Sequence, residues 1–149
     1  MPPRSSRRYA AALWVLLALF TFRVAAQPAA LVLPSVLPPF EIWHSATVPY
    51  GLLLASQLLI LIACGWTAWI FAFDRLSARR GLGVWLQILG GVYFIGMLLR
   101  LVLGFTLLRH VPWFASPIPT VFHLVLATFI LLVGHFHRYG DEAALETRR

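Results

Sequence analysis

Arg100 is the residue around which a functional site is expected, because it is a charged side chain inside a long apolar run. The run 83–108 is long enough to cross a bilayer and contains no other charged residue. A charge at membrane depth costs from ~2.5 to more than 10 kcal/mol, so it normally faces a bundle interior, a water-filled cavity or a counter-charge. We therefore expect Arg100 to be packed against partners from other helices.

Other polar residues interrupt the apolar runs at similar depths. Helical rise counted from the expected outer ends of the helices puts Arg23 and His123 at ~5 Å depth. The same count puts Arg100 and Gln57 at ~13 Å, and an arginine side chain can extend along a helix to meet the others. A proline-rich outer segment, 38–44, is expected to cover this cluster. The candidate ligand-binding residues are therefore Arg100, His123, Gln57, Arg23, Glu41 and His44.

The charge of this cluster indicates what it would bind. Two arginines and one nearby carboxylate, Glu41, leave excess positive charge, which suits an anionic or carbonyl-bearing ligand such as a lipid head group or a quinone. The alternative is a structural role. In that case Arg23 extends to the lipid head groups, Arg100 pairs with Glu41 or with helix carbonyls, and the cluster only fixes the order of the helices.

The five histidines raise a second alternative, b-type haem held by two imidazoles. An outer pair would come from His44, His110 and His123. His135 and His137 are two residues apart, so they point away from each other on a helix. The sequence contains no HExxH, CxxCH or CxxC motif, and we predict no metal site.

No catalytic residues are assigned either. GxSxG, a P-loop and paired intramembrane carboxylates are all absent from the sequence. The question of enzymatic activity stays open, and the missing motifs favour a non-enzymatic accessory or lipid-like-ligand-binding subunit. A membrane redox protein that uses haem or quinone through the outer histidines and Arg100 is the alternative.

Composition assigns the chain to the integral membrane proteins. Its 149 residues are 60% hydrophobic and 11% charged, whereas soluble domains are roughly 25% charged. The formal net charge of +7 comes from arginines that mostly flank apolar runs, so membrane topology explains it better than nucleic-acid binding. The length allows one domain, residues 1–149. Membrane lipids are the expected partners, together with other membrane subunits or further copies of this chain.

The elements that must position the polar residues are four apolar helices, which predict an all-α, four-transmembrane-helix bundle. Two proline-rich loops, 27–47 and 111–119, are expected on the extracytoplasmic side, and Pro28 is expected to end the first helix. Gly96 and Gly104 are expected to share the packed face of the third helix with Arg100. The predicted spans are 9–26, 48–73, 83–108 and 120–137, followed by a polar tail, 138–149.

The distribution of arginines predicts the topology. One arginine, Arg109, lies on the proposed outer side, whereas nine lie on the other side, which by the positive-inside rule is the cytoplasm of a bacterial-type inner membrane. Both termini are then cytoplasmic. Residues 1–26 also have the basic start and small-residue end of a cleavable signal peptide, but Arg23 and the length of the run favour a retained helix. The nine are Arg4, Arg7, Arg8, Arg75, Arg79, Arg80, Arg138, Arg148 and Arg149.

Overall fold

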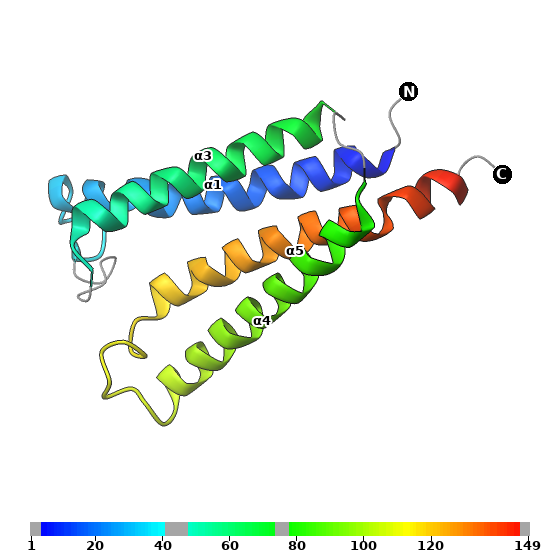
Figure 1. Cartoon of the computed structure of the whole chain (residues 1–149). Coiled ribbons are helices and arrows are strands. Elements are labelled where there is room, and N and C mark those ends of the chain that lie inside the picture. The colour runs from blue at the N-terminus through cyan, green and yellow to red at the C-terminus, as the bar shows by residue number, and fades with distance from the viewer. Residues whose placement is uncertain (1–3, 41–47, 74–77, 147–149) are drawn as a thin grey trace.

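The computed structural model describes residues 4–40, 48–73 and 78–146, and its architecture is all-α (Figure 1). Four long helices form because apolar residues, a minority of them β-branched, continue for more than five turns with few polar interruptions. Each helix is long and apolar enough to cross a membrane. The helices are α1 (Arg4–Val32), α3 (Tyr50–Ala72), α4 (Arg80–Phe105) and α5 (Pro117–Glu146).

Helix α1 is the centre of the arrangement. It packs against α3 on one side and against α5 on the other, while α4 approaches only the backbone of α5 among the described helices. Figure 1 shows the α1/α3 pair above the α5/α4 pair, with the N- and C-termini at the same end of the helices. We call this end the terminus end, and we call the opposite end, which carries residues 33–40 and 106–116, the loop end.

The apolar core lies toward the terminus end, where α1, α3 and α5 meet. On α3 a stripe at helical spacing, consisting of Leu61, Cys64, Ala68 and Phe71, faces this core. The ring of Phe71 lies 4.7 Å from the ring of Phe136 on α5, measured between centroids. Only a small apolar cluster, built around Ala26 and Ala30, continues toward the loop end. The loop-end half of the bundle contains five of the six buried polar residues described, the exception being His137.

Close contact between α4 and α5 depends on glycines. A Cβ atom added at Gly83 would lie 2.5 Å from the backbone nitrogen of Arg138, and one added at Gly134 would lie 3.0 Å from the backbone nitrogen of Gln87. These distances leave no room for a side chain, so the two helices approach each other as small-residue interfaces in membranes do.

The prediction that Gly96 and Gly104 share one packed face is wrong. Gly104 packs tightly on the backbone of Phe114, whereas a Cβ atom at Gly96 would have nothing within 4 Å. Eight residues of an α-helix bring two positions to about 80° apart rather than into line, which is enough to turn Gly96 to the open side.

The predicted end of the first helix is also wrong, because α1 continues through Pro28 to Val32. A proline costs a helix one hydrogen bond, but packing against neighbouring helices compensates for it in a membrane protein. Here Ala26 and Ala30 are buried against Ile118 and Phe122.

The other boundaries differ from the predictions by different amounts. Helix α3 is slightly shorter than predicted, and α4 lies three residues earlier in the chain than its predicted span. Helix α5 differs most, because it runs to Glu146 and the predicted tail from residue 138 is helical up to that point. The apolar stretch of α5 that could lie in a membrane ends at Gly140.

Candidate functional site

Apart from His137 at the terminus end, the buried polar side chains of the described helices gather in the loop-end half of the bundle. From the observed helix ends, Arg100 lies about 8 Å and His123 about 9 Å in, while Gln57 lies about 11 Å and Arg23 about 14 Å in. The predicted depths are thus corrected, most of all for Arg23, because α1 is longer than expected. The four residues still occupy neighbouring levels. Glu41 and His44, also predicted for this site, lie outside the described residues.

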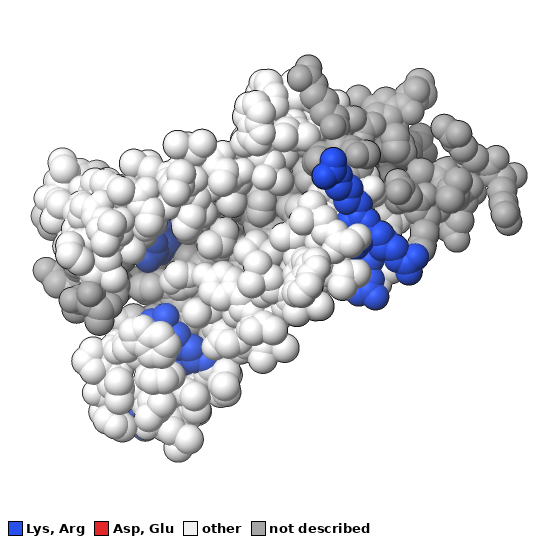
Figure 2. All heavy atoms as spheres, in the orientation of Figure 1, with Lys and Arg blue, Asp and Glu red and all other residues white. Residues whose placement is uncertain are grey.

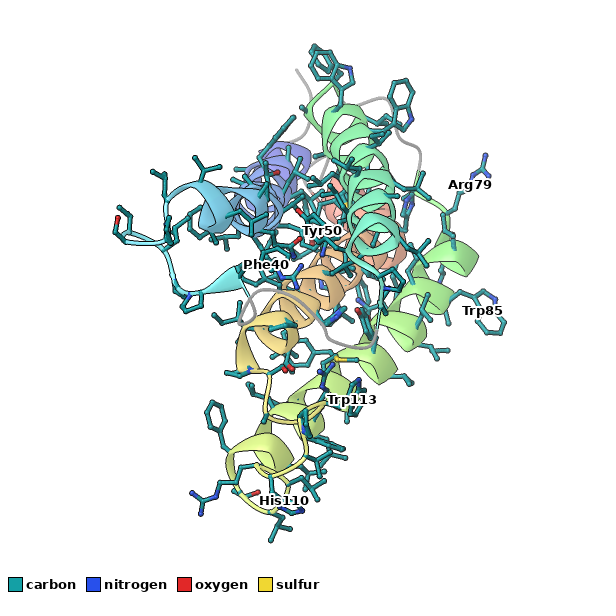
Figure 3. All side chains as sticks on the ribbon, turned by 90° about the vertical axis from the view of Figure 1, so that its left-hand side faces the viewer. Phe40, Tyr50, Arg79, Trp85, His110 and Trp113 are labelled. Carbon is teal, nitrogen blue, oxygen red and sulfur yellow. The ribbon has the colours of Figure 1, made fainter. Side chains whose placement is uncertain are left out.

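Arg100 is held by the turn that follows its own helix. Its Nε and Nη2 atoms donate hydrogen bonds to the carbonyl oxygen of Trp113, at 3.2 Å and 2.6 Å. The guanidinium also lies 4.1 Å from the centre of the Trp113 ring, a cation–π geometry. Figure 3 shows Trp113 on the part of this turn that faces the helices. The prediction that other helices supply the partners of Arg100 is therefore corrected, since the main partner is this local carbonyl.

Arg23 is the more deeply buried of the two arginines. Its side chain is 5% exposed, so it does not extend to the surface as the structural interpretation of the sequence expects. The guanidinium lies 5.6 Å from the centre of the Phe122 ring on α5. Its Nε atom is buried and has no hydrogen-bond partner in the described part of the chain. A buried N–H donor that lacks an acceptor is unfavourable, because it has lost its hydrogen bonds to water.

Gln57 presents a similar situation on α3. The side chain is 4% exposed, and its Oε1 atom is buried without a hydrogen-bond partner among residues 4–40, 48–73 and 78–146. Gln57 lies one helical turn from Leu61, on the stripe of α3 that faces the core. Its amide is consequently directed into the bundle rather than into lipid.

His123 links α5 to α4 through a hydrogen bond and lies near both arginines. Tyr93 on α4 and His123 on α5 share a hydrogen bond of 2.6 Å between the phenolic oxygen and Nδ1. The imidazole is close enough to both Arg23 and Arg100 to interact with each electrostatically. Figure 2 shows arginine side chains on both sides of a hollow between the α1/α3 pair and the turn after α4. The two cations thus face a common region of the bundle.

Four contributors to this region are absent from the sequence prediction. Gln27 is fully buried one helical turn after Arg23. Gln27 lies beyond the predicted end of the first helix, so its position one turn from Arg23 follows only because α1 continues through Pro28. Tyr93 and Phe122 are aromatic residues within apolar runs, and nothing in the sequence distinguishes them from rings that face lipid. Thr120, also fully buried, donates its hydroxyl to the carbonyl oxygen of Ser116.

The histidines considered for haem lie in different environments. His110 is exposed in the turn after α4, and Figure 3 shows it at the outer edge of that turn. At the terminus end, the Tyr9 hydroxyl and His135 Nδ1 are hydrogen-bonded at 2.5 Å, whereas His137 Nδ1 accepts the backbone N–H of Arg79 at 3.3 Å. The described residues contain no group of three or more side chains that could hold a metal ion.

Comparisons with models of protein families, with curated proteins and with solved structures gave no match. The chemistry of the site therefore rests on its own geometry. Hydrogen-bond donors predominate in it, since each guanidinium can only donate and the imidazole and the phenol can do so as well. Such a set of groups binds oxygen atoms that carry negative charge or a carbonyl dipole.

Proposed function

We propose that this chain is a small integral membrane protein that binds the polar head of a lipid-like ligand in the loop-end half of its bundle, with no enzymatic activity of its own. The observation that supports this most directly is Arg23, a buried cation whose Nε donor has no partner in the described chain. A buried donor without a partner is unfavourable at membrane depth, and an anionic or carbonyl oxygen from a ligand would remove that cost.

The distribution of acidic residues supports a ligand rather than internal neutralisation. The chain has five acidic residues, and four of them have sequence positions near the terminus end. One of the four follows α3 in the sequence, and the other three lie in the last turns of α5. Glu41 is the one acidic residue whose sequence position is near the loop end. One carboxylate cannot neutralise two guanidinium groups, so positive charge is left over whatever the position of Glu41. The other four are Asp74, Asp141, Glu142 and Glu146.

We place the loop end outside the cytoplasm and both termini inside, in a bacterial-type inner membrane. Nine arginines near the termini and in the segment 74–80, against Arg109 near the loop end, support this orientation. The ligand would then enter from the extracytoplasmic leaflet, or from the lipid beside the open side of the bundle between α3 and α4.

The experiment is to identify what copurifies with the full-length protein. The protein would be extracted with its surrounding lipid, and bound molecules would be counted by mass spectrometry for the wild type, Arg23→Met and Arg109→Met. We expect an amphiphile enriched over bulk lipid in the wild type and in Arg109→Met, which alters an exposed arginine, and its loss in Arg23→Met. Equal lipid profiles for all three proteins would contradict the proposal. A copurified quinone, or a Soret band in the visible spectrum, would support the redox alternative instead.

A further inference from the structure

The buried polar groups restrict the ligand more narrowly than its charge does. Arg23 can only donate hydrogen bonds, whereas the Oε1 atom of Gln57 can only accept them. The two side chains are 5% and 4% exposed, and neither Arg23 Nε nor Gln57 Oε1 has a hydrogen-bond partner in the described part of the chain. A ligand that satisfies both atoms must therefore contain an acceptor and a donor.

The register of α1 and α3 places these two groups at neighbouring levels. Gly65 on α3 lies beside Leu17 on α1, since a Cβ atom at Gly65 would be 3.8 Å from a Leu17 methyl group. The helices are antiparallel, so eight residues toward the loop end lead from Gly65 to Gln57 and from Leu17 to residue 25. Gln57 thus lies about 3 Å along the axis from the level of Arg23, which is within the size of one lipid head group.

The surrounding charge decides which kind of donor fits. An ammonium group would bring a second positive charge beside the buried guanidinium of Arg23. Like charges repel strongly where water is scarce, whereas a hydroxyl donates a hydrogen bond without adding charge. An anionic head with a hydroxyl group meets both requirements.

We propose that the ligand is an anionic amphiphile whose head group also carries a hydroxyl, with the anionic oxygens accepting from Arg23 and the hydroxyl donating to Gln57. This inference rests on the function proposed above and narrows its ligand class. It excludes quinones and ionised fatty acids, whose heads offer acceptors only, and it excludes ethanolamine phospholipids, whose heads carry an ammonium. Phosphatidylglycerol is the simplest probe of this class.

The test compares two phospholipids that differ in the hydroxyl groups alone. Phosphatidylglycerol and phosphatidylpropanol with identical acyl chains have the same charge and the same number of head-group carbons, and the binding of each to the delipidated full-length protein would be titrated by native mass spectrometry. We expect the wild type to bind phosphatidylglycerol about 5- to 10-fold more tightly, the effect of one buried hydrogen bond. Equal affinities in the wild type would overturn the inference without any variant being needed.

Two variants connect the preference to its atoms. Gln57→Met should bind the two lipids equally, whereas Gln87→Met, which removes the amide of a glutamine nearer the terminus end that donates to the Leu131 carbonyl, should keep the preference. Arg23→Met should weaken the binding of both lipids. If both lipids bind equally but depend on Arg23, the hydroxyl inference fails and the anion site stands. If neither depends on Arg23, the proposed function fails as well.

Discussion

Replacing Arg23 with methionine is expected to make the lipid-free protein more stable, although it should abolish ligand binding. The side chain is 5% exposed, and its guanidinium lies 5.6 Å from the centre of the Phe122 ring. Exchanging buried charges for apolar side chains of similar size stabilises proteins by about 1–4 kcal/mol in favourable cases. The lost cation–π contact costs about 0.5–2 kcal/mol. The midpoints of these two ranges leave a net gain of about 1–2 kcal/mol in the free energy of unfolding.

Arg100→Met is the matched comparison, and it should have the opposite effect. Its guanidinium donates twice to the Trp113 carbonyl and stacks on the Trp113 ring, so the substitution removes interactions that the protein itself completes. A hydrogen bond from a charged group contributes about 1.5–3 kcal/mol, and we expect a loss of about 2 kcal/mol.

Thermal unfolding of the delipidated proteins, followed by intrinsic tryptophan fluorescence, measures both effects. For a chain of this size 1 kcal/mol moves the midpoint by roughly 2–4 °C, so the two variants should differ by about 6–16 °C. If Arg23→Met lowers the midpoint as much as Arg100→Met does, then Arg23 is held by the protein, and the case for a ligand at this position collapses.

Three further substitutions test the packing and the link between α4 and α5. Gly104→Ala would place a methyl group against the carbonyl oxygen of Phe114 and should lower stability by about 1–3 kcal/mol in the same unfolding assay. Gly96→Ala points into open space and should raise stability by up to about 1 kcal/mol. Equal effects of the two substitutions would show that the turn does not rest on α4. Tyr93→Phe removes the 2.6 Å hydrogen bond to His123 and should lower the free energy of unfolding by about 1 kcal/mol. An unchanged midpoint would mean that the imidazole does not depend on this phenol.

The four membrane-spanning helices could be predicted because long apolar runs leave the backbone no alternative to internal hydrogen bonding in a bilayer. The end of α1 could not be predicted in the same way. Pro28 is a signal to stop in local terms, and the packing of Ala26 and Ala30 against α5 overrides it. This helix end depends on Ile118 and Phe122, which are about 90 residues away in the sequence. The local pattern around Pro28 contains no information about them.

The candidate site was predictable in part for the same reason. Arg100 could be identified as buried because a charge in an apolar run must avoid lipid, and it is 9% exposed. Its partner was not predictable, since the position of the Trp113 carbonyl depends on the path of the turn after α4. The depth of Arg23 also depended on a helix end that the sequence misplaces. Residue type thus identified the cations, whereas their neighbours required the three-dimensional arrangement.

The central position of α1 determines when the protein can be completed during its synthesis. Tyr9 in the first helix is hydrogen-bonded to His135 in the last, 126 positions later in the chain. When α1, α3 and α4 have been synthesised, α1 can therefore pack against α3 but not yet against α5. At that stage Arg23 still lacks its contact with the Phe122 ring. Emergence of α5 shields that charge, so the region around Arg23 assembles only after α5 has been made.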